Sequence, residues 1–118
     1  MPGTFKIVGL SFKQTPIEIR EQLALDEMEC KKVLDFVKEF TNAEEALVLS
    51  TCNRTEIYYS SEEDLTLDII KGIAAIKGIA SENIEGYFSN QLDAGEAIRY
   101  LFRVSMGLEA QVVGDIQI

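Results

Sequence analysis

The sequence contains no histidine and no tryptophan, and its 118 residues include only two cysteines and two prolines. Because zinc sites are built mainly from thiolates and imidazoles, Cys30 and Cys52 alone argue against both a metal site and a disulfide framework. Two free thiols fit a reducing, cytoplasmic compartment. No apolar run approaches the ~20 residues of a membrane-spanning helix, and no charged-then-apolar leader opens the chain. We therefore expect a soluble cytoplasmic protein with no membrane contact.

Basic residues are also scarce, because 11 lysines and arginines stand against 20 acidic residues, a formal net charge of −9. Such a surface does not attract nucleic acid as a whole, so any contact with RNA is expected to be local. The glycines form neither a phosphate-cradling loop nor a GxGxxG pattern, which argues against dinucleotide binding in the Rossmann manner. The sequence is, however, 47% hydrophobic, which suits one compact domain over residues 1–118.

The first half of the chain predicts a strand, two helices and two further strands. Residues 5–10 have strand composition, and residues 17–23 follow a proline as a short helix. Asp26 is the expected N-cap of a longer helix that stops before Thr41. Its apolar residues recur at helical spacing and are predicted to be buried: Cys30, Val33, Leu34, Val37 and Phe40. Two strands follow, at residues 46–49 and 57–59.

The second half predicts a helix, a short strand and a final helix. The acidic residues 62–64 cap a helix that ends at Gly78 and whose apolar face holds Leu67, Ile70, Ile73 and Ala74. Residues 87–88 mark a short strand, and residues 93–107 carry a capping box and a terminal glycine. This order predicts an α+β ferredoxin-like split βαβ sandwich with an antiparallel sheet and an additional C-terminal helix. Such a fold does not by itself indicate a function.

The residues best suited to chemistry lie between the two central strands. Cys52 is two positions from Arg54, and a nearby cation favours the thiolate by lowering the thiol pKa from its free value of ~8.5. Thr51 and Asn53 add a hydroxyl and an amide at the same strand end. Arg54 is also able to grip a carboxylate with two parallel hydrogen bonds. Cys52 is therefore a candidate nucleophile; the alternative is a small buried cysteine near a turn, beside a solvated arginine.

Three blocks of residues, spread over nearly the whole chain, carry a resemblance to a known family. They are VGLSFKQTP (8–16) with residues 19–21, LSTCNRTEIY (49–58), and LFRV (101–104) with residues 107–109 and 114–118. In this order and spacing they resemble the N-terminal catalytic domain of glutamyl-tRNA reductase. The block around Cys52 is highly specific, and the last block supports it independently.

The resemblance implies a reaction in two stages. The Cys52 thiolate attacks the ester carbonyl of glutamyl-tRNA to form a thioester, which NADPH reduces to glutamate-1-semialdehyde in tetrapyrrole (porphyrin, haem) biosynthesis. Arg54 is the implied partner of the glutamyl side-chain carboxylate, and Tyr100 stands at a catalytic position. The positions implied to contact substrate are Thr51, Asn53, Arg54, Ala110, Asp115, Ile116 and Gln117.

The NADPH-binding and dimerisation domains of the family are absent from these 118 residues. The resemblance therefore implies that this single glutamyl-binding domain does not complete the reduction, and that NADPH is bound by a domain outside this chain. The implied partners are glutamyl-tRNA, glutamate-1-semialdehyde aminomutase and, in the full-length family protein, a second copy of the chain. The apolar end at residues 116–118 likewise predicts that the natural protein continues.

The chain departs from the family pattern at several site positions. Tyr100 stands where the family has a histidine, Ala110 where a serine is typical, and Asp115 where a glutamate is typical; residues 11–12 replace an Asn-His pair. A tyrosine with a pKa of ~10 donates a hydrogen bond to an oxyanion but is a poor general base near neutral pH. These departures keep a second interpretation open, a non-catalytic ferredoxin-like ligand-binding or regulatory module. Only the enzyme needs a reactive Cys52.

Other polar and aromatic residues have competing interpretations. Arg20 and Glu21 either belong to the pocket or form an exposed helical pair. The arginines at positions 99 and 103 either form a basic strip toward tRNA or lie on a solvated helix face. Of residues 58 and 59, both tyrosines, one is predicted to pack inward and the other to cover the sheet edge.

Overall fold

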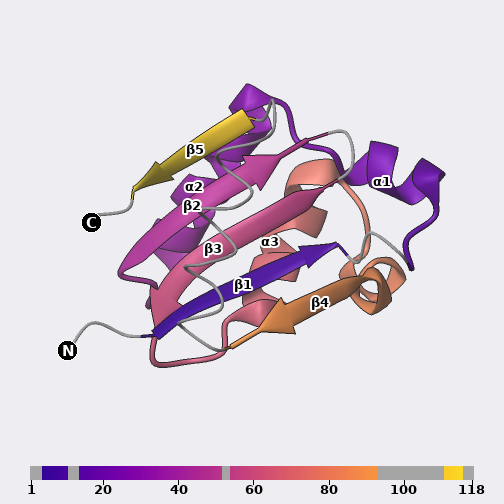
Figure 1. Cartoon of the computed structure of the whole chain (residues 1–118). Helices are drawn as coiled ribbons and strands as arrows, with labels where there is room; N and C mark the ends of the chain where they lie inside the picture. The colour runs from indigo at the N-terminus through magenta and orange to yellow at the C-terminus, as the bar shows by residue number, and fades with distance from the viewer. Residues whose placement is uncertain (1–3, 11–13, 52–53, 93–110, 116–118) are drawn as a thin grey trace.

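The computed structural model describes residues 4–10, 14–51, 54–92 and 111–115. The first half of the chain forms β1 (Thr4–Leu10), α1 (Ile17–Leu23), α2 (Glu27–Phe40), β2 (Glu45–Ser50) and β3 (Thr55–Ser61). The second half forms α3 (Thr66–Lys77), two 3-10 turns, η1 (Ser81–Asn83) and η2 (Glu85–Tyr87), and the strands β4 (Phe88–Gln91) and β5 (Gln111–Asp115). Figure 1 shows these elements on one twisted sheet.

The five strands form one antiparallel sheet in the order β4-β1-β3-β2-β5. Strands β1 to β4, with helices α2 and α3 in the two crossovers, are the split βαβ arrangement. The prediction of a ferredoxin-like α+β sandwich with an antiparallel sheet is therefore confirmed. Strand β5, which is not among the predicted strands, extends the sheet beyond β2. The predicted C-terminal helix falls within residues 93–107, outside the described part of the chain.

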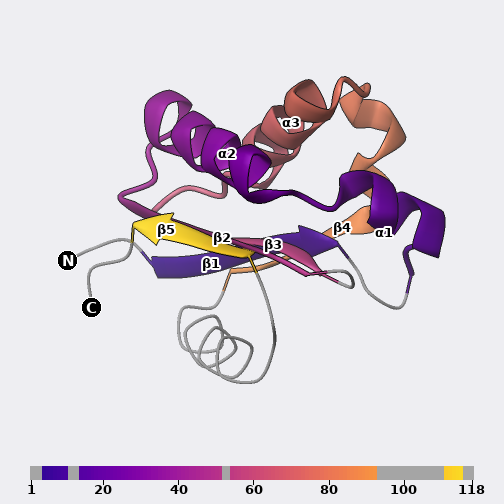
Figure 2. The same ribbon diagram turned by 90° about the horizontal axis from the view of Figure 1, so that it is seen from above.

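Helices α2 and α3 lie on the same face of the sheet and pack against each other (Figure 2). Burial of apolar surface between the helices and the central strands is the main stabilising contribution, at roughly 25 cal/mol per Å². Cys30 is fully buried in this layer, as its helical spacing predicts. The core side chains come from both helices and from three strands, and include Val33, Val37, Ile69, Ile73, Val8, Val48 and Ile57.

The ends of the helices follow the local signals in the sequence. Asp26 Oδ1 accepts a hydrogen bond from Glu29 N at 2.8 Å, and Glu29 Oε1 accepts one from Asp26 N at 3.0 Å, so α2 begins with a capping box. Asp64 Oδ1 accepts from Thr66 N at 3.0 Å at the start of α3. Gly78 ends α3 with a φ of 70°, a left-handed conformation that glycine adopts without a steric cost.

Two residues of the predicted apolar helix faces are exposed instead of buried. Phe40 is 69% exposed because it is the last residue of α2, where its ring packs beside that of Phe36 at a centroid distance of 5.3 Å. Leu67 is 59% exposed because it lies in the first turn of α3, where it lines an open hollow. Helical periodicity identifies a face, but it does not say where the neighbouring layer ends.

Strand β3 is the middle strand of the sheet, and all of its residues are buried. Ile57 and Tyr59 belong to the core beneath the helices, so Glu56 and Tyr58 project from the opposite face, because successive strand residues alternate. The prediction that one of the two tyrosines covers the sheet edge is wrong, since β3 has a strand on each side. Tyr58 and Tyr59 are 1% and 0% exposed.

Candidate active site

The turn between β2 and β3 is closed by two hydrogen bonds between Thr51 and Arg54. The Thr51 N–H donates to Arg54 O at 2.8 Å, and the Arg54 N–H donates to Thr51 Oγ1 at 2.9 Å. Ser50 and Thr55 face each other as the last pair of the ladder just below. Cys52 and Asn53 themselves lie outside the described residues. The residues on either side of them are nevertheless fixed, so the candidate nucleophile belongs to a short connection with a well-defined base.

The base of this turn is tied to the segment between α1 and α2. Ser50 Oγ accepts a hydrogen bond from Leu25 N at 3.0 Å, and Thr55 Oγ1 donates to Leu23 O at 3.3 Å. Both side chains are buried, with exposures of 3% and 1%. Buried polar groups that are satisfied in this way hold a loop in one position, because breaking either bond leaves an unsatisfied group in the interior. The base of the turn is thus part of the scaffold.

A buried carboxylate lies just beyond the turn on β3. Glu56 is 8% exposed, and the Tyr58 hydroxyl donates to its Oε1 at 3.2 Å. Burial raises the pKa of Glu56 above its ordinary value, while the charge of Arg54 and the hydrogen bond from Tyr58 act in the opposite direction. Burial also raises the pKa of Tyr58, and the neighbouring Glu56 raises it further. Tyr58 therefore remains a neutral hydrogen-bond donor near neutral pH.

Gly9 of β1 provides the space for this carboxylate. Gly9 is opposite Glu56 in the antiparallel ladder. A Cβ at residue 9 would lie 2.8 Å from Glu56 Cγ, a distance that Cβ atoms essentially never show, and 3.0 Å from Thr55 O, which is also a tight contact. The stem of Glu56 therefore crosses the position that a side chain on β1 would otherwise fill.

The second cysteine lies in an environment unsuited to chemistry. Cys30 is fully buried, and its thiol donates to Leu25 O with an Sγ to O distance of 3.8 Å. Burial, together with the acidic side chains at the start of α2, raises the pKa of Cys30 to about 11. A thiol that stays protonated and lacks solvent access is unreactive. The interpretation of Cys30 as a packing residue is confirmed.

The structure brings some of the predicted site residues together. Thr51 and Arg54 share the turn. Gln111 of β5, which was not predicted to belong to the site, is paired with Ser50 beside it. Asp115 is paired with Ala46, four strand positions from Ser50, which corresponds to about 14 Å. The structure therefore does not bring Asp115 to the turn. The remaining predicted site residues lie outside the described part of the chain: Cys52, Asn53, Tyr100, Ala110, Ile116 and Gln117.

Arg20 and Glu21 lie on α1, where Glu21 is exposed and Arg20 is half-buried. The arginines at 99 and 103 lie outside the described residues. No role was predicted from the sequence for Glu56 or Gly9. The available signal was an acidic residue at the second position of a strand of otherwise neutral residues, since an unpaired charge there is costly.

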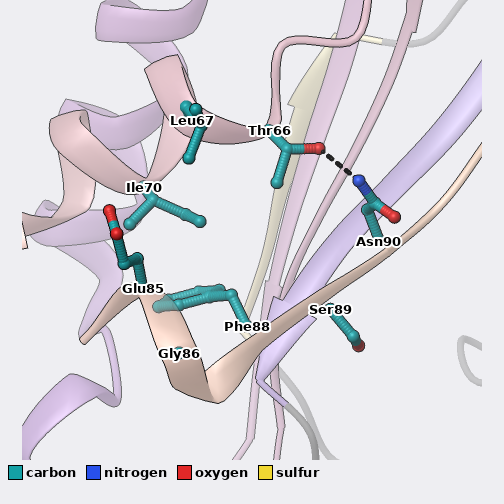
Figure 3. Close-up of a pocket in the computed structure, with 8 residues that line it drawn as sticks. All are labelled: Thr66, Leu67, Ile70, Glu85, Gly86, Phe88, Ser89 and Asn90. Carbon is teal, nitrogen blue, oxygen red and sulfur yellow. Dashed lines mark hydrogen bonds between the residues drawn. The ribbon is translucent and has the colours of Figure 1, made fainter. Parts of the chain in front are cut away.

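A separate hollow of about 350 Å³ lies between α3 and β4 (Figure 3). Asn90 Nδ2 donates to Thr66 Oγ1 at 2.9 Å across its rim, and the ring of Phe88 lies next to Ile70. The lining includes Glu85 but no lysine or arginine. This hollow therefore offers no counter-charge to a carboxylate ligand, and the turn that carries Arg54 is the better candidate site.

Among the residues that the structure describes, no group of three or more histidine, cysteine or acidic side chains is arranged to hold a metal ion. Within the same ranges, none of the helices has the length and apolar character needed to cross a membrane.

Comparison with known proteins places this arrangement in a family context. The family described as Glutamyl-tRNAGlu reductase, N-terminal domain, matches residues 8–118. The chain is 46% identical over its whole length to the glutamyl-tRNA reductase of Cytophaga hutchinsonii, covering 28% of that protein. It is 36% identical to the Aquifex aeolicus protein of that name over 98% of this chain, and 40% identical to that of Desulforudis audaxviator over 95%. The chain thus spans about a quarter of the length of the curated relatives it matches, 28% and 25% of these last two.

Proposed function

The chain belongs to the family of the N-terminal domain of glutamyl-tRNA reductase, and from this membership we propose that it takes over the glutamyl group of glutamyl-tRNA in tetrapyrrole biosynthesis. The Cys52 thiolate attacks the carbonyl carbon of the ester. The bond from that carbon to the ribose oxygen breaks, and this oxygen takes up a proton from solvent, which balances the proton that the Cys52 thiol gave up. The tRNA leaves with a free hydroxyl, and the glutamyl group remains as a thioester. The observation that carries the proposal is the closed turn in which Thr51 and Arg54 flank Cys52.

Arg54 has two functions in this proposal. Its positive charge stabilises the thiolate of Cys52 and so increases the fraction of reactive nucleophile at neutral pH. Its guanidinium also offers a planar pair of donors for the side-chain carboxylate of the glutamyl group. Thr51 and Asn53 hold the same group from either side of the nucleophile.

The other predicted residues complete the proposal. The Tyr100 hydroxyl donates a hydrogen bond to the oxyanion that forms on the attacked carbonyl, in place of the family histidine. Ala110, which directly precedes β5, is the position of this segment proposed to contact the substrate. Asp115 is paired with Ala46, about 14 Å from Ser50 along β2, so contacts of Asp115, Ile116 and Gln117 with the glutamyl group are not part of the proposal. Because Ala110 lacks the hydroxyl of the typical serine, this chain has one hydrogen bond fewer to offer there.

The described residues do not fit NADPH. Acidic side chains precede or begin both long helices, Asp26 and Glu29 at α2 and Asp64 at α3. A phosphate at either helix start would meet the negative charge of these side chains. We therefore assign no reductive step to this chain. We propose that NADPH is bound by the part of the longer protein that this chain, at 28% of the length of its Cytophaga hutchinsonii relative, does not cover.

Glutamyl-tRNA is the proposed substrate partner, and the cytoplasm the proposed location. With a formal net charge of −9, the chain favours a limited contact with the tRNA end that carries the amino acid. Dimerisation and transfer of the product to glutamate-1-semialdehyde aminomutase are proposed for the longer protein.

The test is capture of the thioester. The chain and its Cys52→Ser variant are incubated with tRNA charged with labelled glutamate, quenched in acid and analysed for label bound to protein. Cys30→Ser is the matched control, because it removes the other thiol. We expect label on the wild type and on Cys30→Ser, and none on Cys52→Ser.

A second arm joins this chain to the remaining part of the Cytophaga hutchinsonii relative, which supplies what the 118 residues lack. No label in either form, with tRNA deacylated only at the background rate, would overturn the proposal in favour of a non-catalytic binding module.

A further inference from the structure

Three consecutive outward positions on one face of the sheet carry charged or polar groups near the turn. Arg54 precedes β3, and Glu56 and Tyr58 follow at alternate positions, so all three share the face opposite the long helices. Glu56 and Tyr58 are almost completely buried and are joined by the 3.2 Å hydrogen bond. Arg54 is only half-buried. These three residues form an array, Arg54–Glu56–Tyr58, that is buried at Tyr58 and accessible at Arg54.

We propose that Glu56 is a positioning residue: its carboxylate, fixed by the Tyr58 hydroxyl, orients the Arg54 guanidinium so that Arg54 accepts a glutamyl and rejects a glutaminyl side chain. This inference rests on the proposed function of Cys52 and Arg54. It adds the reason why the site selects a glutamyl over a glutaminyl group. Glu56 itself touches neither the substrate nor the thiol in this arrangement.

The chemistry of arginine allows both contacts at once. The guanidinium has five N–H donors in a fixed plane, so it is able to donate to Glu56 on one edge and to a ligand carboxylate on another. A lone arginine on a turn samples many rotamers, whereas one held by a buried carboxylate is preorganised for its ligand. The opposing effects of burial and of Arg54 on the pKa of Glu56 agree with such a contact.

Packing alone does not account for Glu56. A buried charge costs free energy that an apolar residue at the same position would avoid. The chain nevertheless also gives up a side chain at Gly9, where a Cβ would collide with Glu56 Cγ. The buried Glu56 and the glycine at position 9 are both unfavourable for stability, and Glu56 lies four residues from the candidate nucleophile. A role at the site explains this combination better than packing does.

The experiment compares two substrates on the same protein. Rates of label transfer to Cys52, as kcat/KM, are measured for glutamyl-tRNA and for the same tRNA charged with glutamine. The ratio of the two does not depend on the amount of folded protein, so a purely structural defect leaves it unchanged. For Glu56→Gln we expect the ratio to fall about 10-fold or more, because misplacement by ~1 Å can cost about 100-fold.

Two controls separate the array from general packing. Tyr58→Phe, which frees the Glu56 carboxylate, should lower the ratio in the same direction. Tyr59→Phe removes an equally buried hydroxyl from the same strand, one that accepts from Leu65 N at 3.0 Å, and should leave the ratio unchanged. In an Arg54→Ala background, Glu56→Gln should have no further effect on the ratio, as expected of residues that act in series.

If Glu56→Gln left the preference for glutamyl-tRNA unchanged while Arg54→Ala removed that preference, the inference would be overturned and the proposed function would remain intact. An additive effect of Glu56→Gln in the Arg54→Ala background would also overturn it. No label on wild-type Cys52 with either substrate would instead refute the proposed function, and the inference with it.

Discussion

Gly9 and Glu56 face each other across strands β1 and β3, and a Cβ on residue 9 would lie 2.8 Å from Glu56 Cγ. The absence of a side chain on one strand therefore permits a buried carboxylate on the other. This pairing links the first strand to the turn that carries Cys52, although the two segments are far apart in the sequence.

The pairing makes a substitution at residue 9 costly. Gly9→Ala should lower the free energy of unfolding by about 1–3 kcal/mol, the usual range for overpacking a buried site. Urea denaturation measures this change. Gly86→Ala is the matched control, because a Cβ there meets nothing within 4 Å. The destabilisation should shrink when Glu56→Ala is added, since Glu56 Cγ is then gone; equal costs in both backgrounds would show that the strain comes from the Thr55 carbonyl alone.

The buried carboxylate should also give stability a pH dependence of known sign. Burial raises the pKa of Glu56 above its ordinary value of 4.5 in the folded chain. Such a group contributes its full stabilising free energy below pH 4.5, and this contribution is lost as the pH rises through the pKa of the folded state. The free energy of unfolding of the wild type minus that of Glu56→Gln should therefore fall as the pH increases above 4.5.

Asp64 provides a control of opposite sign. Hydrogen bonds from Thr66 lower the pKa of Asp64 below its ordinary value of 3.8. Its contribution is present above 3.8 and is lost as the pH falls through the folded value, so the same difference for Asp64→Asn should rise with pH. Urea denaturation at a series of pH values measures both. Slopes of the same sign would contradict the assignment of the two environments.

The tie between the turn and the segment before α2 should be visible in a single amide. Ser50→Ala removes the acceptor of the buried Leu25 N–H, which costs about 1–3 kcal/mol of stability. Hydrogen exchange at Leu25 should accelerate more than that of the neighbouring core. Ser89→Ala, on the exposed face of β4, is the control. Unchanged exchange at Leu25 would mean that Ser50 does not anchor the turn.

The sequence predicted the features that depend on local signals. Asp26 was predicted to begin α2 and Gly78 to end α3, and both residues lie at those helix ends in the structure. Neither the role of Gly9 nor that of Glu56 follows from its own neighbours, because each depends on a strand register set far away in the chain. Strand β5 was not predicted for the same reason, because its two adjacent valines form a strand by pairing with β2, which is distant in the sequence.

Prediction of the site was uneven for a related reason. The motif identified Thr51 and Arg54, whose mutual hydrogen bonds are local. The burial of Glu56 was missed because a central strand is covered on both faces, and the alternation of residues within β3 does not show this.

The two cysteines should differ sharply in reactivity. Cys30 has no exposed surface, and burial raises its pKa to about 11, so its thiol stays protonated at neutral pH. In the proposed function, Cys52 is accessible and its thiolate is stabilised by Arg54. Iodoacetamide at neutral pH, followed by peptide mass spectrometry, should therefore label Cys52 far faster than Cys30, and Arg54→Ala should slow Cys52 while leaving Cys30 unchanged. If both thiols reacted at the same slow rate, Cys52 would be a packing residue and the chain would have no nucleophile to offer.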